Sequence, residues 1–500
     1  KTAMPSALLY TMHDPKYNYL YETDPEPFMN NRKMFCPRGK MLGGCSSHNG
    51  MVHVRGNAMD FENWGQLGLS NWNYESVLPY FKKSESIEGL DTEYRNTDGP
   101  LKLSRTENGN ILSKIYLEAA AEAGYEINND MNGYKQEGFG LMDTTIFDGK
   151  RQSTSVTYLH PIKQRQNLTL ITNIQVSKII IENSSAIGVE IKNKNELEKI
   201  FAEKEVLLSA GAINSPQILM LSGVGPEEEL KNHGINVISA LNGVGENLQD
   251  HLETYVQYEC TKPVTLYSSF NPINMALIGL QWFLFKKGIA AHSNLEIGGF
   301  IRTNEMVDYP NMQYHFFPSL VIDHGRQNPS CHAFQAHVGP MRPTSRGFVK
   351  LKSSNPIDSP RIQFNYMQTE HDLNEMREGI EIARNIFHQK AFDHYRGKEI
   401  SPGENINSDD GLNNFIRSKG DTAYHPSCTC KMGNDDMSVV DQDLKVYGVE
   451  KLRVVDASIM PNIVSGNLNA TTVMIAEKAS DLIQNKITAE KVNIEFYKAS

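Results

Sequence analysis

Strand-like and helix-like segments alternate along the 500 residues of this sequence, and that alternation limits its fold more than any other feature. Runs rich in β-branched residues predict strands over residues 175–181, 186–192, 205–209 and 452–456. Helices that alternate with such strands pack against the faces of a sheet, so the sequence predicts an α/β architecture. A chain of this length buries a large core and is expected to form two or more domains.

Helical periodicity is clearest where apolar residues recur at spacings of three and four, which puts them on one buried stripe: Leu373, Met376, Ile380, Ala383 and Phe387. A second helix is predicted over residues 112–123, with Gly124 as its stop. A third is predicted to start at Ser215 and Pro216, because serine caps a helix and proline fits its first turn. The last is predicted to start near Asn469. No repeat or low-complexity linker divides the sequence, so its domains are predicted to be interleaved.

Acidic side chains outnumber basic ones, 59 to 49, for a formal net charge of −10. Nucleic-acid binders usually present a basic face, so this balance argues against that class of protein. The longest apolar run, residues 273–285, is interrupted by Gln281 and is shorter than the roughly 18–20 residues that cross a bilayer. The sequence therefore predicts a soluble protein and leaves contact with a membrane surface open.

Six cysteines in a chain of this length are too few for a disulfide scaffold, which predicts a reduced, cytoplasmic setting. Cys428 and Cys430 lack a second cysteine pair at metal-binding spacing, so no metal site is predicted. The sequence starts at Lys1, close to an apolar stretch, which indicates that its natural beginning is missing.

Glycine-bearing turns occupy residues 39–44, 223–225 and 243–245. Glycine lets backbone amides approach a phosphate or a flat ring closely, so each turn could hold part of a nucleotide. Taken singly, each fits an ordinary tight turn better than a nucleotide site, since no G-x-G-x-x-G fingerprint occurs in the sequence. The turns alone leave both alternatives open.

The residues around these turns resemble the signatures of the glucose–methanol–choline (GMC) flavoprotein oxidoreductases. Six segments carry the resemblance in the family's order: residues 37–51, 54–57, 211–226, 244–251, 423–433 and 465–470. The last two are similar to the family's catalytic segments. The sequence is therefore identified as a member of this family. The resemblance implies an FAD cofactor and a Rossmann-like α/β domain interleaved with an antiparallel-sheet substrate domain of α+β type.

The resemblance assigns residues 1–60, 150–260 and 420–490 to the FAD-binding domain and residues 61–149 and 261–419 to the substrate-binding domain. Within the family, segments such as residues 132–140 and 395–402 resemble bacterial choline dehydrogenases. The implied reaction is oxidation of choline to betaine aldehyde, a step toward glycine betaine, by hydride transfer to flavin N5. Another primary alcohol stays an alternative substrate.

One part of the family pattern is absent from the sequence. Family members open with a strand, a G-x-G-x-x-G turn and an acidic residue that hold FAD, roughly fifty to sixty residues in all. A flavin-free, inactive fragment is therefore a further alternative.

By resemblance, His425 takes the position of the family's active-site base, and a histidine suits proton transfer near neutral pH. Asn469 matches the second catalytic position, which is histidine or asparagine in the family, and its amide would orient the substrate oxygen. A structural histidine before proline and a helix N-cap are the alternative roles of these two residues.

The resemblance also implies a set of flavin contacts: Gly43, Gly44, Ser47, Asn49, Gly50, Val176, Asp456, Ala457, Asn469 and Ala470. The glycine segment would line the ring and phosphate side, and Val176 would meet the adenine through its backbone. Residues 43–49 are similar to choline oxidases in which the histidine at the position of His48 is covalently linked to FAD. Those enzymes continue with serine where this sequence has Gly50, so covalent and noncovalent flavin both stay open.

Choline carries a fixed positive charge, which requires an aromatic or carboxylate pocket. Tyr424 resembles a substrate-pocket tyrosine of choline oxidases, and Glu296 is the candidate carboxylate because apolar residues flank it. A solvated surface position is the alternative for Glu296. Tyr314, Phe316 and Phe317 are expected either to wall the pocket or to pack in the core.

The expected partners are choline or a similar small alcohol and an electron acceptor, which the sequence leaves open between a respiratory quinone and oxygen. No nucleic acid is expected as a partner. The expected location is cytoplasmic, with peripheral contact at the inner membrane and a homodimer both left open.

Overall fold

The computed structural model describes residues 2–106, 109–193, 196–486 and 489–499. The described residues form two large hydrophobic cores, each assembled from segments that lie far apart in the sequence. An antiparallel sheet supports one core and a short parallel pair of strands lies in the other. The fold is therefore mixed, with α/β and α+β parts.

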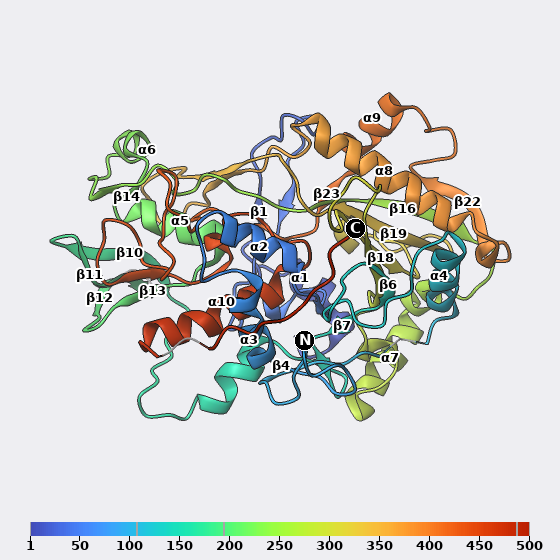
Figure 1. Ribbon diagram of the computed structural model, residues 1–500, viewed down its shortest axis with the longest axis horizontal. Coiled ribbons are helices and arrows are strands. Elements are labelled where there is room, and N and C mark those ends of the chain that lie inside the picture. The colour runs from blue at the N-terminus through green and yellow to red at the C-terminus, as the bar shows by residue number, and fades with distance from the viewer. Residues whose placement is uncertain (1, 107–108, 194–195, 487–488, 500) are drawn as a thin grey trace.

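The antiparallel sheet has the order β22 (Arg396–Ser401), β16 (Leu252–Cys260), β19 (Ala333–Pro340), β18 (Met312–Phe317), β17 (Ile297–Ile301) and β6 (Gly138–Leu141), with β23 (Asp421–Thr422) paired to β16. Helices α8 (Glu370–Phe387) and α4 (Ile111–Glu122) pack beside it, at the right of Figure 1. Both helices confirm predictions from the sequence, since apolar periodicity marked α8 and the glycine stop marked α4.

The two faces of this sheet differ because side chains alternate along each strand. On β18, Tyr314 and Phe316 belong to the hydrophobic core that α8 covers. Gln313, His315 and Phe317 line a cavity on the other side. Of the three aromatic residues with two expected roles, Phe317 therefore walls the cavity and the other two pack in the core.

Helix α8 comes unusually close to the sheet. Thr369 caps its N-terminus by accepting a hydrogen bond from the backbone N–H of Asp372 at 3.3 Å. A Cβ on Gly379 would lie 2.7 Å from Val338 of β19, so only glycine permits this approach. The Tyr314 hydroxyl donates to the Gly379 carbonyl at 2.9 Å. Each large apolar side chain buried along this contact contributes about 1.5–3 kcal/mol of stability.

The other core contains the parallel pair β13 (Val206–Leu208) and β24 (Leu452–Val454). Beside it lies a three-stranded antiparallel sheet of β10 (Gln175–Glu182), β11 (Ser185–Asn193) and β12 (Glu196–Phe201). Four of these five strands confirm the strands predicted from β-branched runs. Figure 1 shows this group at the left, with the last helix, α10 (Leu468–Ile483), below it.

Shorter elements surround these two cores. The helices are α1 (Leu8–Met12), α2 (Ala58–Gln66), α3 (Tyr74–Ser84), α6 (Glu227–Asn232), α7 (Pro272–Phe285) and α9 (Asp409–Lys419). The strands are β1 (Tyr21–Glu22), β2 (Phe35–Cys36), β3 (Val52–His53), β4 (Glu85–Ser86), β5 (Leu101–Lys102), β7 (Asp143–Thr144), β8 (Ile146–Phe147), β9 (Lys150–Arg151), β14 (Val224–Gly225), β15 (Ser239–Ala240), β20 (Phe348–Lys350) and β21 (Arg361–Gln363).

Helix α5 (Gly211–Leu221) begins earlier than the sequence predicts. The prediction that Ser215 caps this helix and that Pro216 opens its first turn is wrong, because both residues lie inside it. Gly211, at φ +84°, turns the chain from β13 directly into the helix. Asp456 accepts the backbone N–H of Gly211 at 2.8 Å, so a carboxylate distant in sequence takes the capping role predicted for serine.

Pro216 is tolerated inside α5 because another group satisfies the carbonyl that proline leaves unpaired. An interior proline lacks the N–H that would bond the carbonyl four residues earlier, here that of Ala212. The Thr429 hydroxyl donates to this carbonyl at 2.7 Å. The Ser215 hydroxyl in turn donates to Asp456 at 2.5 Å. These contacts join α5 to the segment that carries His425.

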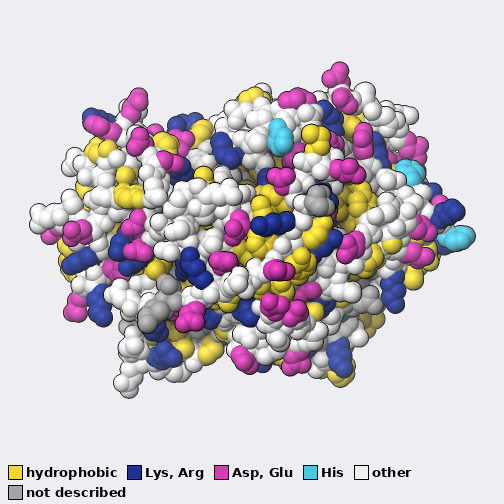
Figure 2. Space-filling model, viewed as in Figure 1, with side chains coloured by type: hydrophobic (Ala, Val, Ile, Leu, Met, Phe, Trp, Pro, Cys, Tyr) yellow, Lys and Arg dark blue, Asp and Glu magenta, His cyan; other side chains and the backbone are white. Residues whose placement is uncertain are grey.

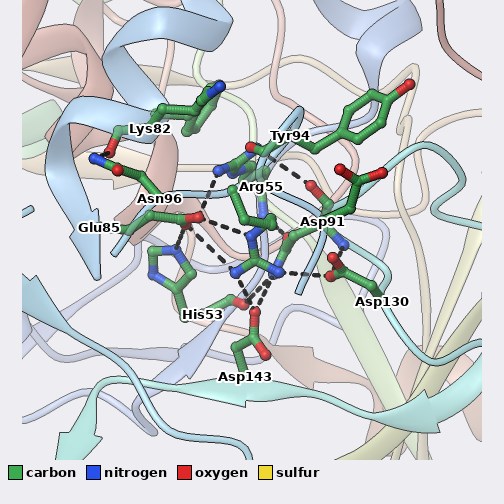
Figure 3. Close-up of polar contacts among 12 residues, drawn as sticks. His53, Arg55, Lys82, Glu85, Asp91, Tyr94, Asn96, Asp130 and Asp143 are labelled. Atoms are coloured by element: carbon green, nitrogen blue, oxygen red, sulfur yellow. Dashed lines mark hydrogen bonds and ion pairs between the residues drawn. The ribbon is translucent and has the colours of Figure 1, made fainter. Parts of the chain in front are cut away.

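A buried ion-pair network centred on Glu85 holds one side of the molecule together (Figure 3). Glu85 pairs with Arg55 at 2.8 Å and with Arg95 at 2.7 Å, and Arg95 also reaches Asp143 at 2.5 Å. Burial alone would raise the pKa of Glu85, but Arg55 and Arg95 hold it well below its ordinary range. Arg55 closely follows β3, whose Val52 lines the cavity, so the network anchors one cavity wall.

The surface carries charges of both signs. Figure 2 shows acidic and basic side chains interspersed over one face, with hydrophobic side chains gathered near its centre. Helix α7 contains 14 residues, mostly apolar, with Asn274 and Gln281 as its polar side chains. Among the described residues, no helix combines the length and the apolar character needed to cross a membrane.

Candidate active site

A cavity of about 1630 Å³ is lined by residues from both parts of the fold. Pockets for a single drug-sized ligand usually measure about 300–1,000 Å³, so this one has room for a large ligand and a small one together. The antiparallel sheet supplies one side of the cavity through β16, β18 and β19. The other side comes from residues 39–50, called the glycine segment below, and from the first turns of α5 and α10.

His425 lies in this cavity and is held at three points. Its backbone N–H donates to Asp250 at 2.6 Å. Its Nδ1 lies 3.0 Å from Nδ1 of His251, and its Nε2 lies 3.3 Å from Nδ2 of Asn467. The ring therefore has a fixed orientation, with one nitrogen toward His251 and the other toward an amide.

The hydrogen bonds of His251 determine the tautomer of His425. Nε2 of His251 lies 3.0 Å from the Met341 carbonyl, which can only accept, so this nitrogen carries the proton. Nδ1 of a neutral His251 must then accept, and Nδ1 of His425 donates to it. The lone pair of His425 is left on Nε2, which is the atom that can take a proton.

Both histidines are neutral near pH 7. Burial lowers the pKa of His251 to about 4. Burial, with His251 and Arg38 nearby, lowers the pKa of His425 well below the usual 6.5. A neutral imidazole with an unprotonated Nε2 is the form that acts as a general base.

Asn467, and not Asn469, is the asparagine next to His425. Asn467 is the N-cap of α10, yet its side chain makes no capping hydrogen bond. Gln313 of β18 instead donates to Oδ1 of Asn467 at 3.0 Å, which directs Nδ2 toward His425. Asn469 lies in the first turn of α10 and lines the cavity, and no described hydrogen bond joins it to His425. The resemblance indicated Asn469 for this position, and no signal used in the sequence analysis pointed to Asn467.

The glycine segment forms a tight wall of the cavity. Gly43, Gly44, Asn49 and Gly50 all line it. Gly43 has φ +84°, and a Cβ there would lie 2.6 Å from Oγ of Ser47. Ser47 is buried behind this wall and donates to a backbone carbonyl, so it supports the turn and does not line the cavity.

Three further predicted flavin contacts meet the same cavity and two do not. Asp456, Ala457 and Asn469 line it. Ala470 is buried in the core one residue further along α10. Val176 lies half-buried on β10, outside the cavity lining.

His48 lines the cavity with a free ring nitrogen. The residue is 5% exposed, and its Nδ1 is buried without a hydrogen-bond partner. An unpaired polar atom in such a place is costly unless a bound group satisfies it. Burial raises the pKa of the neighbouring Cys45 thiol, but Arg38 and His48 outweigh it and bring that pKa to about 6. This wall therefore presents polar and ionisable groups to a ligand.

A carboxylate and three rings cluster on the sheet side of the cavity. Side chains alternate along β16, which brings Glu253 and Tyr255 to the cavity face. Tyr255 is paired with His337 of β19, and His337 is paired in turn with His315 of β18. Glu253 Oε1 lies 3.0 Å from Nδ1 of His337 and 3.1 Å from the Tyr255 hydroxyl. Burial would raise the pKa of Glu253, but His337 and His315 lower it below its ordinary value. The cavity thus holds an ionised carboxylate beside aromatic rings, which suits an organic cation.

The two substrate residues predicted from the sequence lie in different places. Tyr424 lines the cavity, and its hydroxyl lies 2.7 Å from Nδ1 of His324. Glu296 is 3% exposed, lies outside the cavity lining and pairs with His292 at 3.3 Å. Sequence reasoning missed Glu253, although its alternation with the apolar residues of β16 is a signal that could have found it.

Comparisons with known proteins show the family of this chain. Two family models described as GMC oxidoreductase match residues 7–253 and 343–476. Mitochondrial choline dehydrogenase of Mus musculus is 49% identical over 500 residues, which cover 100% of this chain and 84% of that protein. Oxygen-dependent choline dehydrogenase of Acinetobacter baumannii (strain AYE) is 50% identical over 506 residues, which cover 100% of this chain and 92% of that protein.

Solved structures share the fold over almost the whole chain. Pyridoxine 4-oxidase from Mesorbium loti has a TM-score of 0.88 at 26% identity and covers 97% of this chain and 92% of its own. A formate oxidase of Aspergillus oryzae, in a structure that concerns FAD modification, has a TM-score of 0.91 at 25% identity, with coverage of 97% and 91%. These likenesses confirm the fold class and the family resemblance predicted from the sequence.

Proposed function

We propose that this chain, which belongs to the GMC oxidoreductase family, oxidises choline to betaine aldehyde with FAD as its cofactor. The observation that carries the proposal is that one cavity holds both a neutral histidine and an ionised carboxylate. His425 presents an unprotonated Nε2, and Glu253 presents negative charge among the rings of Tyr255 and His337. Identity of 49–50% to proteins named choline dehydrogenase supports the same substrate.

The residues on the glycine side of the cavity fit FAD. Gly44 faces open space, so a ring or a phosphate can approach its backbone, and His48 offers an unpaired ring nitrogen. Asp456, Ala457 and Asn469 would complete the cofactor side. When bound there, FAD supplies the acceptor for the hydride that leaves the alcohol carbon.

The other residues of the cavity bind the cation, take the proton and orient the alcohol oxygen. Glu253 and its rings hold the trimethylammonium group through charge and cation–π contact. Nε2 of His425 takes the proton of the alcohol hydroxyl. Nδ2 of Asn467 donates a hydrogen bond to the alcohol oxygen, which gains negative charge as its proton leaves. We assign Asn467, in place of Asn469, the orienting role expected from the sequence.

Covalent attachment of the flavin through His48 is the finer part of the cofactor proposal. A buried histidine nitrogen without a partner supports it. Acid precipitation of the purified protein tests it, since a linked flavin stays with the pellet. Release of all the flavin into the supernatant would show that His48 does not form this bond.

The proposal also covers the domain division, the electron acceptor, the location and the oligomeric state. We infer the division expected from the sequence, with residues 1–60, 150–260 and 420–490 in the FAD-binding domain and residues 61–149 and 261–419 in the substrate-binding domain. We make one change: β16 (Leu252–Cys260) belongs with the substrate-binding part, because it pairs within the antiparallel sheet. The electron acceptor is a respiratory quinone or oxygen, and the protein is cytoplasmic with peripheral contact at a membrane. A homodimer is consistent with this placement.

An anaerobic visible spectrum tests the choline assignment. The purified full chain is supplied with FAD and titrated with choline, and we expect loss of the flavin band near ~450 nm. The neutral isostere 3,3-dimethyl-1-butanol serves as a matched substrate, and we expect it to act at least about tenfold more weakly because it lacks the cation. Equal bleaching by both alcohols would instead favour another primary alcohol as substrate. A flavin band that persists with choline would overturn the assignment.

A further inference from the structure

We infer that helix α7 (Pro272–Phe285) docks on the surface of a bilayer that contains anionic lipids. The inference names the surface for the peripheral membrane contact proposed above and rests on that proposal, and it is independent of the choline assignment. Helix α7 places apolar side chains in water, and lysines border it at one end.

The exposure of α7 is unusual for a helix of a water-soluble domain. Six of its large apolar side chains are more than half exposed: Ile273, Leu277, Leu280, Phe283, Leu284 and Phe285. The helix contains no Asp, Glu, Lys or Arg. Contiguous apolar surface of this kind marks a site of interaction with a partner or a membrane.

Within the part of the chain that the structure describes, α7 is held mainly through one buried side chain. Trp282 is its buried residue, and the indole donates to the Gly149 carbonyl at 2.7 Å. Trp282 packs with Ala290 and Ala291, and Met4 from the start of the chain joins this small cluster. The attachment fixes the orientation of α7 and leaves its other side free.

The length of α7 decides how it would meet a membrane. Its 14 residues span about 21 Å, which is shorter than the ~30 Å hydrocarbon layer of a bilayer. The helix therefore lies along the interface with its apolar side among the acyl chains, as short apolar surface helices do.

Lysines border the apolar surface. Lys286 ends the helix in the left-handed conformation, with Nζ 4.3 Å from the centre of the Trp282 ring, and Lys287 follows it in an exposed position. The turn that receives the Trp282 hydrogen bond carries exposed Lys150. Asp148 is the acidic residue of that turn. A cluster of lysines is notable on a chain whose net charge is −10.

This combination favours lipid over a protein partner. Protein interfaces are depleted in lysine and carry a rim of paired polar groups. Lys286 donates to the carbonyls of Trp282 and Phe283, so anionic headgroups would pair with the exposed Lys150 and Lys287 while the acyl chains receive the apolar side chains. The surface around α7 thus complements both the charged headgroups and the acyl chains of one leaflet.

The inner side of α7 ties the docking surface to the active site. Met275, Ile278 and Gly279 of the helix line the large cavity. The lipid-facing surface and the cavity wall are therefore two sides of one helix. Docking would place the cavity directly beside the bilayer.

Vesicle co-sedimentation of the full chain tests the inference. We expect binding to vesicles of phosphatidylcholine with phosphatidylglycerol, and weaker binding both to phosphatidylcholine alone and at high salt. Phe283→Ser with Phe285→Ser should lower partitioning by roughly tenfold or more. Lys150→Glu with Lys287→Glu should remove the preference for the anionic vesicles.

Leu197→Ser with Phe201→Ser is the matched control, because these exposed apolar residues lie on β12, at the other end of the molecule in Figure 1. We expect this variant to bind vesicles like the parent chain. Thermal unfolding of all three variants near the melting temperature of the parent chain shows that they fold, whichever alcohol the chain oxidises. Absence of vesicle binding, or equal binding by every variant, overturns the inference. So does a dimer in analytical ultracentrifugation that Phe283→Ser with Phe285→Ser dissociates, since a second copy would then cover α7.

Discussion

His251 and His425 face one another through their Nδ1 atoms at 3.0 Å, and this contact decides which nitrogen of His425 can act as a base. The Met341 carbonyl holds the proton of His251 on Nε2, so Nδ1 of His251 accepts and Nδ1 of His425 donates. The lone pair of His425 is thereby kept on Nε2, next to Asn467. His251 is a positioning residue, because it acts on a substrate only through His425.

Replacement of His251 tests this relationship. His251→Leu removes the acceptor, so we expect kcat/KM for choline to fall by about 10²-fold, the usual effect of a misplaced catalytic group. His251→Asn offers an amide oxygen to Nδ1 of His425 and should recover most of that loss. The measurement is kcat/KM for both variants across pH. Equal losses would mean that His251 only fills space.

The two asparagines at the start of α10 are predicted to differ in importance. Asn467→Ala should lower kcat for choline about 10²–10³-fold, the effect of losing one donor to a developing negative charge. Asn469→Ala is the matched control in the same helix and cavity, with an expected loss below about tenfold. Steady-state kinetics of both variants decide between them. The reverse ranking would return the orienting role to Asn469.

Two carboxylates are predicted to differ in substrate binding. Glu253→Gln keeps the shape of the side chain but removes its charge, so KM for choline should rise about 10- to 100-fold with kcat nearly unchanged. KM for the neutral isostere should hardly change. Glu296→Gln is the control, since Glu296 lies outside the cavity lining. If Glu296→Gln raised KM and Glu253→Gln did not, the cation site would lie where the sequence alone placed it.

The pH profile is predicted from the environment of the base. Burial and neighbouring charges lower the pKa of His425 well below 6.5, so the active, neutral form persists as the pH falls through 6.5. We expect kcat/KM for choline to stay level down past that value and to fall about tenfold per pH unit only below the pKa of His425. The pKa of Glu253 is also low, so Glu253→Gln should leave the acid limb in place. A limb centred at or above pH 6.5 would contradict the role of His425.

The ion-pair network around Glu85 predicts a large effect on stability. Glu85→Gln leaves Arg55 and Arg95 buried without their shared counter-charge, which should lower the free energy of unfolding by about 3–5 kcal/mol. Glu126→Gln breaks an exposed pair with Lys135 and should cost about 0–1 kcal/mol. Thermal unfolding of both variants measures the difference. Similar melting temperatures would show that the buried network adds little.

The low pKa of Glu85 in the folded chain also predicts how its contribution to stability changes with pH. Its pKa is lower in the folded state, so the stability that it contributes is present above the pKa of the unfolded chain. That stability is lost as the pH falls through the acidic range. The gap in unfolding free energy between the parent chain and Glu85→Gln should therefore shrink on acidification.

Regular elements could be predicted from the sequence where the local pattern and the tertiary packing agree. The apolar stripe of α8 satisfies both, and so do the β-branched runs of β10 and β11. The start of α5 could not be predicted, because Asp456, distant in sequence, caps it and Thr429 compensates for Pro216 inside it. Local capping signals cannot reveal partners that only the folded chain brings near.

The residues of the candidate site could likewise be predicted only where local sequence was enough to identify them. Motif resemblance indicated His425, Tyr424 and the glycine segment, and all of them line the cavity. The choice between Asn467 and Asn469 depends on the residue at which α10 begins, which the sequence pattern leaves uncertain by a few positions. Glu253 depends on which face of β16 meets the cavity, and that is set by the neighbouring strands.

The pairing of β13 with β24 has a consequence for synthesis of the protein. Val206 and Leu452 are paired neighbours, although most of the second half of the chain separates them. Because a ribosome releases the N-terminal part first, the antiparallel sheet can assemble while this pair still lacks its second strand. Asn467 and α10 emerge later still. A nascent chain interrupted before that point would carry a finished sheet with Glu253 in place, yet it would lack Asn467 and have a cavity that stands open on one side.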